Sequence, residues 1–279
     1  MNISWKAAVA ALAIICCAGG TARADQLADI KAHGKLVCGA LGTVEPFSFQ
    51  DPQTRETVGY EIDQCRAVAK ALGVDLEIKL LSVEARIPEL SQGRVDILAA
   101  ALGYSDERAK QIDYSVTSFI SRQMLMVRAD GGITQINDLK DKKISAPKGS
   151  SSENYIRTLL PEANVLTYQD PPTAFLALKQ MKVNALVLSE LALISFQQQA
   201  GPEFTLIKQP VAIERWGLGV RKGEPALLEA VNNALKSMET SGQASEIFTK
   251  WLGADTKYKL QRSFKVGDPI GNPELAPKT

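Results

Sequence analysis

The stretch Gly59–Leu102, GYEIDQCRAVAKALGVDLEIKLLSVEARIPELSQGRVDILAAAL, decides the fold class of this chain. Apolar residues recur every three or four positions over Gly59–Leu72, which predicts an amphipathic helix. Asp75–Leu81 alternates apolar and polar residues like a half-buried strand, Ile87–Gly93 reads as a short helix, and Val95–Leu102 is an uninterrupted apolar strand. Helices that alternate with short apolar strands predict parallel α/β units.

The same alternation begins again after Met124–Val127, so the chain contains two α/β sets of similar size. Strands are expected at 144–146, 165–167 and 185–188, and helices at 150–160, 173–181 and 190–199. Two amphipathic helices follow at 225–238 and 244–252, and the remaining segment 253–279 is expected to lie extended across a surface. Two sets of this kind predict two lobes.

Composition excludes several classes of protein. The 279 residues are 45% apolar and 23% charged, ordinary values for a globular chain, and the formal net charge is only +1. A near-neutral chain has no overall field to hold a nucleic acid. The single histidine excludes a His-rich metal site and argues against a histidine-based catalytic triad, so neither a metal nor a cofactor is expected.

Residues 1–24 have the pattern of a secretory signal peptide. Lys6 precedes the apolar run 7–17, and Ala22-Arg23-Ala24 places small residues where a signal peptidase reads them, so cleavage is expected after Ala24. The alternative, a membrane anchor, needs roughly 20 apolar residues. Removal of Lys6 and Arg23 changes the formal net charge from +1 to −1. The expected location is the periplasm.

Short motifs in a fixed order connect the chain to a known family. They are Gly34-Lys35-Leu36, Pro46–Phe49, Gly59–Asp63, Ser105–Arg108, Ile112–Ser115, Asp138–Lys140, Lys148–Ser152 and Gly242–Ala244. Together they resemble family 3 of the bacterial solute-binding proteins, the periplasmic receptors of polar-amino-acid ABC transporters. The segment Leu260–Phe264 resembles the glutamate/aspartate-binding branch.

The resemblance implies a type II periplasmic-binding-protein fold of class α/β. Each lobe would be a sheet flanked by helices, and two hinge strands would join the lobes. Lobe 1 is expected to comprise 25–119 plus 216–279, and lobe 2 to comprise 120–215. The implied function is a monomeric receptor that closes on a small polar solute, such as an amino acid, and delivers it to a membrane permease without chemical reaction. Two alternatives stay open: an enzyme on the same scaffold, like cyclohexadienyl dehydratase, or a ligand sensor that docks on a signalling receptor.

Arg108 is the first candidate for ligand contact. It follows the carboxyl end of the strand Val95–Leu102, where open α/β sheets bind their ligands. A guanidinium offers paired donors to a carboxylate, and in the family the arginine here binds the α-carboxylate of the ligand. The alternative is a solvated arginine in the charged turn Asp106–Lys110.

The loop Gly149–Glu153 is the second candidate. It opens a helix, where free backbone N–H groups and the helix dipole favour an anion. The resemblance implies that Ser150, Ser151 and Ser152 contact the same carboxylate from lobe 2, mainly through the backbone at Ser151. The alternative is an ordinary helix cap without a ligand.

The part of the site that would receive the ligand side chain departs from the family pattern. Val44 and Val83 stand where family members often carry aromatic rings. Of the two arginines that hold a side-chain carboxylate in the acidic-ligand branch, Arg86 matches one, whereas Leu41 replaces the other. The sequence therefore supports an acidic ligand only in part. Arg86 is equally compatible with an exposed position at a helix start.

The expected ammonium contacts are also incomplete. Ser189 aligns with the aspartate that usually binds the α-ammonium, and Ala101 and Gly103 replace residues that commonly carry hydroxyl groups. A buried ammonium without a counter-charge is costly. Three glutamates are candidates to supply it, each with solvated surface charge as the alternative: Glu190, Glu45 and Glu84. Glu190 and Glu45 are also the acids that an enzyme would use.

Cys38 and Cys65 remain after signal removal. Cys38 lies on the first predicted strand and Cys65 on the core-facing side of the helix that should pack against it. In an exported protein this favours a disulfide, with two buried thiols as the alternative.

Overall fold

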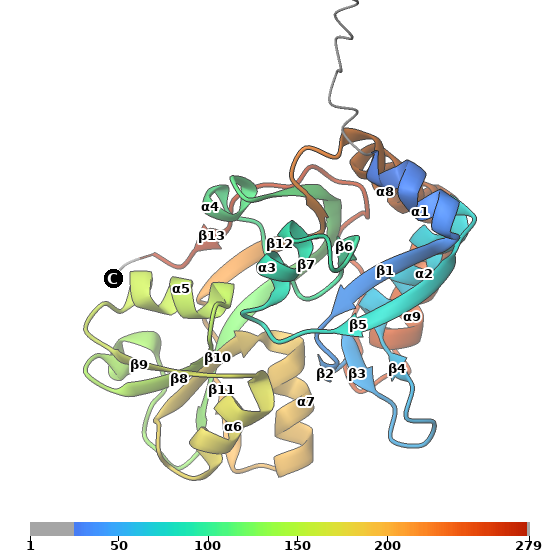
Figure 1. Ribbon diagram of the computed structural model, residues 1–279. Helices are drawn as coiled ribbons and strands as arrows, with labels where there is room; N and C mark the ends of the chain where they lie inside the picture. Colours follow the sequence, from blue (N-terminus) through green and yellow to red (C-terminus); the bar gives the residue numbers. More distant parts are fainter. Residues whose placement is uncertain (1–24, 278–279) are drawn as a thin grey trace, which may run out of the picture.

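A mixed β-sheet runs through the whole molecule, with helices on its faces (Figure 1). The structure is a computed structural model that describes residues 25–277. The main path of the sheet has the strand order β5-β1-β6-β12-β7-β10-β8-β9. The elements of residues 25–111 are α1 (Gln26–His33), β1 (Lys35–Ala40), β2 (Thr43–Val44), β3 (Ser48–Gln50), β4 (Thr57–Val58), α2 (Tyr60–Leu72), β5 (Asp75–Leu80), α3 (Arg86–Ser91), β6 (Ile97–Leu98) and α4 (Asp106–Ala109).

The second half of the chain repeats the alternation of strand and helix. Its elements are β7 (Ile112–Arg128), η1 (Ile136–Leu139), β8 (Lys143–Pro147), α5 (Ser151–Leu159), β9 (Asn164–Tyr168), α6 (Pro171–Lys179), β10 (Ala185–Ser189), α7 (Glu190–Ala200), β11 (Phe204–Leu206), β12 (Ala212–Arg221), α8 (Pro225–Thr240), α9 (Gln243–Leu252) and β13 (Glu274–Leu275). The expected helices all form, and their ends differ from the expected ones by a few residues.

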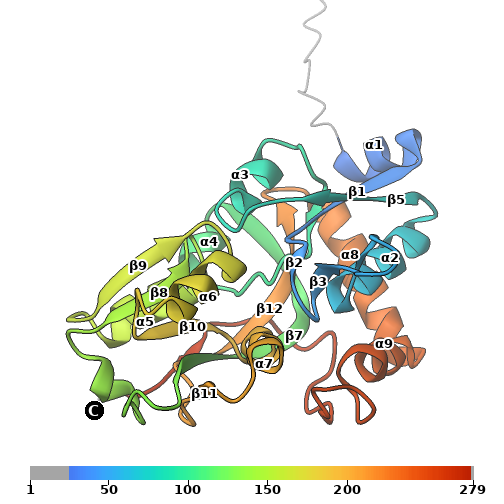
Figure 2. The same ribbon diagram turned by 90° about the horizontal axis from the view of Figure 1, so that it is seen from below.

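Two long antiparallel strands connect the two halves. β7 and β12 pair from Gln123 opposite Ala212 to Ile112 opposite Arg221, and their register shifts around Gly217. Figure 2 shows these strands between α2, α8 and α9 on one side and β8, β9 and α5 on the other. The expected lobe boundaries at 119/120 and 215/216 fall inside β7 and β12, and we keep "lobe 1" and "lobe 2" for the residue ranges that they define.

Parallel strands make up the outer part of the sheet in each half. β1 pairs in parallel with β5 and β6, and β8 pairs in parallel with β9 and β10. Helix α2 packs on β1 and β5, and α6 packs on β8 and β10. A small separate sheet of β2, β3 and β4, which the sequence pattern did not predict, lies beside α2.

The strand expected at Val95–Leu102 is much shorter than predicted. Only Ile97–Leu98 is a strand, and Ala101 has a left-handed backbone with φ of 50°. Side chains bind the backbone groups beyond it: Glu61 accepts from the Ala101 amide, and Arg86 donates to the Ala101 carbonyl. Because these polar groups are already satisfied, no neighbouring strand is needed to pair with them.

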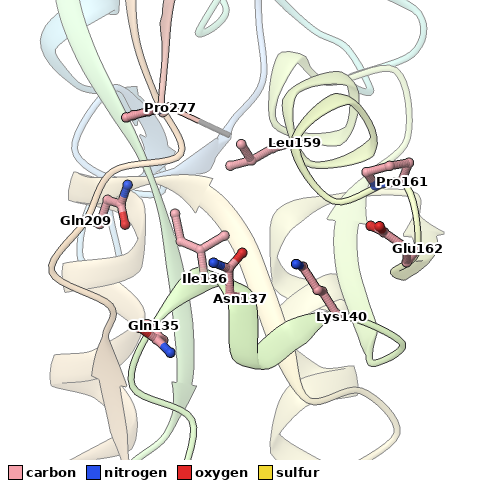
Figure 3. Close-up of a pocket in the computed structure, with 9 residues that line it drawn as sticks. All are labelled: Gln135, Ile136, Asn137, Lys140, Leu159, Pro161, Glu162, Gln209 and Pro277. Atoms are coloured by element: carbon pink, nitrogen blue, oxygen red, sulfur yellow. The ribbon is translucent and has the colours of Figure 1, made fainter. Parts of the chain in front are cut away.

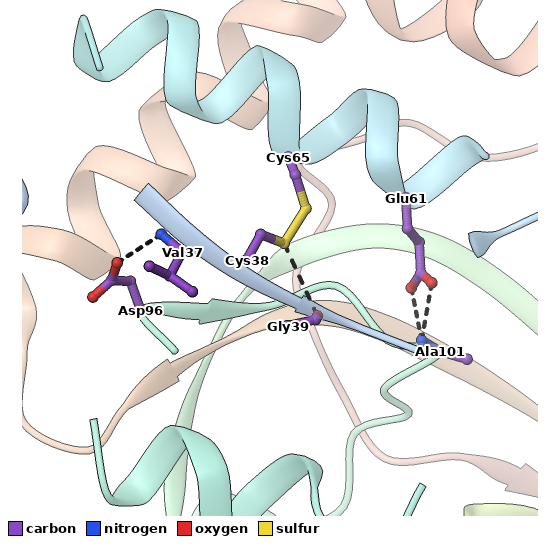
Figure 4. Close-up of a disulfide and its surroundings, with 7 residues drawn as sticks. All are labelled: Val37, Cys38, Gly39, Glu61, Cys65, Asp96 and Ala101. Carbon is purple, nitrogen blue, oxygen red and sulfur yellow. Dashed lines mark hydrogen bonds between the residues drawn. A yellow bond between two sulfur atoms is a disulfide. The ribbon is translucent and has the colours of Figure 1, made fainter. Parts of the chain in front are cut away.

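The disulfide joins the first strand to the helix above it. Cys38 on β1 and Cys65 on α2 are both fully buried, and the structure links them (Figure 4). Cys65 lies on the buried side of α2 with Ile62, Val68 and Ala69. The bridge therefore fixes α2 onto β1.

The segment after α9 crosses the back of the hinge strands. The amide of Thr117 in β7 donates to the carbonyl of Asp268, and β13 pairs with β12 at Ala212 and Ile213. The proposed signal peptide lies outside the described residues. Within 25–277, no helix has the length and apolar character needed to cross a membrane.

Candidate functional site

Residues from both lobes and from the hinge strands line a small cavity. Its volume is about 30 Å³, enough for one or two water molecules. The lining residues that the sequence had singled out for the ligand site are Val44, Val83, Arg86, Ala101, Ser150, Ser151, Ser152 and Ser189. Leu41, which stands at the position of the second family arginine, also lines the cavity. Residues that the sequence reasoning had not assigned to the site complete the lining: Gln123, Pro147, Pro171, Leu188, Glu214 and Trp216. Most of the predicted residues thus converge in space.

Arg86 is a buried cation on the lobe 1 side of this cavity, and only 3% of the residue is exposed. Its guanidinium donates to the carbonyl oxygens of Val83 at 2.8 Å, Ala100 at 2.8 Å and Ala101 at 3.0 Å. It also reaches the carbonyl of Gly149 in lobe 2 at 3.3 Å. Burial, and secondarily the neighbouring Arg108 charge, lowers the pKa of Arg86 to about 9. The alternative of an exposed residue at a helix start is therefore wrong.

Arg108 approaches the same carbonyl. It lies on the one-turn helix α4, which Ser105 caps, and it is buried. Nη1 donates to the Gly103 carbonyl at 2.9 Å, and Nη2 donates to the Gly149 carbonyl at 3.0 Å. The alternative of a solvated arginine is thus wrong. Arg108 is not among the side chains that line the cavity, but with Arg86 it converges on one acceptor from the other lobe.

The amino end of α5 presents three buried serines to the cleft. Ser150 caps the helix by accepting from the Glu153 amide at 3.1 Å. Ser151 donates to Glu214 at 3.2 Å, and Ser152 donates to Gln123 at 2.6 Å. The serine hydroxyls are therefore hydrogen-bonded within the protein, and the backbone N–H groups of the first turn supply the anion-binding character of this end.

The backbone of Gly149 in lobe 2 packs directly against lobe 1. Its φ is 73°, and a Cβ atom there would lie 3.3 Å from the Cα atom of Glu84 in lobe 1. Next to this contact, Lys148 and Glu84 form an ion pair at 2.8 Å. On the other side of the cleft, Ser195 of α7 donates to Glu45 at 2.7 Å. The lobes are held together by contacts on both sides of the cavity.

Glu214 is the cavity residue with the greatest chemical consequence that the sequence reasoning missed. It lies on β12 and is 1% exposed. Its Oε1 atom accepts from Gln123 at 2.6 Å, from Trp216 at 2.6 Å and from Ser151 at 3.2 Å, and Oε2 accepts from the Tyr155 hydroxyl at 2.6 Å. All four donors are neutral, and Glu214 forms no ion pair with any residue in 25–277.

Glu61 on α2 contacts the backbone of Ala101, which lines the cavity. Its two carboxylate oxygens accept from the Ala101 amide at 2.8 and 3.1 Å (Figure 4). Burial raises the pKa of Glu61 to about 7, although the Ala101 hydrogen bond and the Arg86 charge both act in the opposite direction. The backbone of Ala101 is therefore held by an acidic side chain at its amide and a basic side chain at its carbonyl.

The three glutamates expected to supply a counter-charge all lie outside the cavity lining. Glu190 pairs with Arg122 at 3.3 Å and lines a separate cavity of about 370 Å³ behind the hinge, and burial raises its pKa. Glu45 pairs with Lys257 at 2.7 Å. Glu84 pairs with Lys148. Each of them already has a cationic partner.

A larger groove of about 350 Å³ is lined mainly by lobe 2 residues, together with Pro277 near the end of the chain (Figure 3). Its charged residues, Lys140 and Glu162, are exposed. Within 25–277, no group of three or more His, Cys, Asp and Glu side chains is placed to hold a metal ion. The inter-lobe cavity, with buried arginines and a buried glutamate around it, remains the candidate site.

The fold consists of two lobes joined by the strands β7 and β12, and the candidate site lies in the cleft between the lobes. This arrangement defines the class of bacterial periplasmic-binding-protein folds. The solved structure of the ancestral amino acid-binding protein AncCDT-1, a precursor of cyclohexadienyl dehydratase, superposes with a TM-score of 0.76 at 29% identity and covers 82% of this chain and 100% of that one. The predicted fold class is confirmed. Residues 36–254 match the sequence profile of the bacterial extracellular solute-binding proteins, family 3, and the chain belongs to this family.

Relatives with assigned ligands support the same assignment. The glutamine-binding protein GlnH of a Bacillus subtilis ABC transporter is 33% identical over 83% of this chain and 86% of its own length. The L-cystine-binding protein TcyJ of Escherichia coli is 30% identical over 91% and 97%. The glutamate/aspartate import solute-binding protein of Escherichia coli is 27% identical over 95% and 94%. The resemblance stated from the motifs is thus confirmed, and the protein is a solute-binding protein.

Proposed function

We propose that this protein captures an α-amino acid in the inter-lobe cavity and delivers it to the permease of an ABC transporter. The observation that carries the proposal is the convergence of Arg86 and Arg108 from lobe 1 and the amino end of α5 from lobe 2 on one point. Paired guanidinium donors and helix N–H groups both favour a carboxylate. The named ligands of the relatives, glutamine, cystine and glutamate or aspartate, all contain one beside an ammonium.

Closure follows from this division of donors between the lobes. A ligand carboxylate would compete with the Gly149 carbonyl for Arg86 and Arg108, and it would gain the α5 N–H groups only when the lobes meet. The ligand therefore binds the closed form more tightly and shifts the population toward it. Ligand sites usually measure roughly 300 to 1,000 Å³, so the lobes must separate from the arrangement described here to admit an amino acid.

Receptor function is favoured over an enzyme on the same scaffold. The proposed general acids, Glu190 and Glu45, pair with Arg122 and Lys257 outside the cavity. Export to the periplasm, a monomeric state and docking of the closed form on the permease belong to the same proposal. Formation of phenylpyruvate from prephenate, or of phenylalanine from arogenate, would favour the enzyme instead.

Thermal-shift screening of residues 25–279 against the standard amino acids and L-cystine tests the proposal. At least one of them should raise the melting temperature, because a ligand that binds only the folded protein stabilises it. The same compound should lower the radius of gyration measured by small-angle X-ray scattering. Stabilisation by sugars or metal ions alone would contradict the proposal.

A further inference from the structure

The buried carboxylate of Glu214 requires a functional explanation. It is 1% exposed, it lines the inter-lobe cavity, and its hydrogen-bond donors Gln123, Ser151, Trp216 and Tyr155 are all neutral. Buried carboxylates are normally paired with a cation. Oε1 already accepts three hydrogen bonds, whereas Oε2 accepts only the one from Tyr155 among residues 25–277 and therefore retains capacity for a further donor.

The position of Glu214 suits the ammonium group of an α-amino acid. Ser151, at the helix end that should bind the ligand carboxylate, touches Glu214 directly. On the lobe 1 side, a Cβ atom at Gly103 would lie 2.1 Å from Oε2, so Glu214 fills the space beside the residue whose carbonyl holds Arg108. In an α-amino acid, one carbon separates the carboxylate from the ammonium. The Glu214 carboxylate lies next to the N–H groups that should bind the ligand carboxylate. It is therefore placed where the ligand ammonium would lie.

We propose that Glu214 binds the α-ammonium group of the ligand and makes the site selective for α-amino acids over the corresponding carboxylic acids. The inference rests on the proposed function. It assigns to Glu214 the role for which Glu190, Glu45 and Glu84 were candidates, and those three have cationic partners elsewhere. Because Gly103 has no side chain, the Glu214 carboxylate can approach this point.

A purely structural role for Glu214 makes a different prediction. Ser151 and Tyr155 belong to lobe 2, so Glu214 also ties α5 to the hinge strand β12. Loss of such a tie would weaken closure around every ligand by a similar factor. Loss of an ammonium partner would weaken binding only of ligands that carry the ammonium.

Calorimetric titration with matched ligand pairs separates the two roles. The pairs are L-glutamine with glutaramate, L-glutamate with glutarate, and L-cystine with 3,3′-dithiodipropionate, and the members of each pair differ only in α-amino groups. For whichever amino acid the wild-type protein binds, Glu214→Gln should weaken binding at least about tenfold, the effect of losing one charge-assisted hydrogen bond. Its effect on the partner without the amino group should stay within about twofold.

Three further variants complete the test. Glu224→Gln changes a buried glutamate that accepts from Arg221 and lies outside the cavity, and it should leave both affinities unchanged. Glu190→Gln should do the same, whereas a selective loss of amino-acid affinity in this variant would assign the role to Glu190 and overturn the inference. Glu214→Asp, which keeps the charge on a shorter side chain, should retain part of the selectivity.

Each outcome of these titrations either supports or overturns the role of Glu214 as the ammonium partner. If Glu214→Gln weakens the binding of both members of a pair equally, or weakens the binding of neither, the inference is overturned and the proposed function stands. A wild-type protein that binds the deaminated partner as tightly as the amino acid overturns it without any variant, so the test does not depend on the folding of Glu214→Gln. Failure of the wild-type protein to bind any amino acid would remove the proposed function itself.

Discussion

Glu214 occupies the space that a side chain at position 103 would need. A Cβ atom on Gly103 would lie 2.1 Å from Oε2 and 2.6 Å from the carboxylate carbon of Glu214. Two residues more than a hundred positions apart are therefore interdependent. The absence of a hydroxyl side chain at position 103, which looked like a lost ligand contact, has a steric reason.

Gly103→Ala should displace the Glu214 carboxylate and disturb its four hydrogen bonds. Overpacking of a buried site costs about 1 to 3 kcal/mol, so both the free energy of unfolding and the affinity for the amino-acid ligand should fall. Chemical denaturation and calorimetry measure the two effects. Gly271→Ala is the matched control, because in the described part of the chain no heavy atom beyond its own chain neighbours lies within 4 Å of the Cβ position there. Equal behaviour of the two variants would refute the steric relationship.

Removal of the disulfide should lower stability substantially. Cys38 and Cys65 enclose a sequence separation of 27, for which loss of the crosslink costs about 3 to 4 kcal/mol in the chain-entropy account. We expect the double variant Cys38→Ser with Cys65→Ser to unfold at a lower urea concentration than the oxidised wild-type protein. The reduced wild-type protein serves as the control. Two reactive thiols in denatured protein that has seen no reductant would show that the bridge does not form.

Glu61 should make the stability of the protein depend on pH. Its pKa in the folded protein is about 7, against 4.5 for the ordinary value, because burial disfavours the charged carboxylate. Below about pH 4.5 the group is protonated in both states. As pH rises from there to about 7, the unfolded chain releases the proton more readily than the folded protein does. The free energy of unfolding therefore falls by about 3 kcal/mol over this interval.

Glu61→Gln tests this dependence by removing the titrating group. Urea unfolding of the wild-type protein and of the variant should be measured between pH 4.5 and 8. The difference in unfolding free energy between the two proteins should change in this interval and level off above about pH 7. A difference that does not vary with pH would show that Glu61 titrates normally in the folded protein.

The sequence predicted the parts of the site that depend on local patterns. Ser150 was expected to open a helix after a strand, and it caps α5. Arg108 was expected directly after a strand that ends at Leu102; the strand ends at Leu98 instead, and Arg108 lies on α4, from which it reaches Gly149 in lobe 2. These features follow from residues that are neighbours along the chain, and the resemblance to a family supplied their expected roles.

The sequence did not reveal features that arise from distant contacts. Glu214 sits in the stretch Ile213–Trp216, where nothing local shows which side chain faces the cleft. Its partners Ser151 and Tyr155 lie 63 and 59 positions away. The strand at Val95–Leu102 was overestimated for the same reason, because Arg86 and Glu61 reach the backbone at Ala101 from other elements.

Calorimetric titration of the amino-acid ligand into wild-type, Arg108→Ala and Arg66→Ala proteins tests the central claim most directly. Arg108→Ala should weaken binding by about a hundredfold or more, because a charge-assisted, two-pronged contact with the ligand carboxylate is lost. Arg66 pairs with Asp63 on the exposed side of α2, and its replacement should leave affinity unchanged. Wild-type affinity in the Arg108→Ala protein would contradict the claim that an amino acid binds in this cavity.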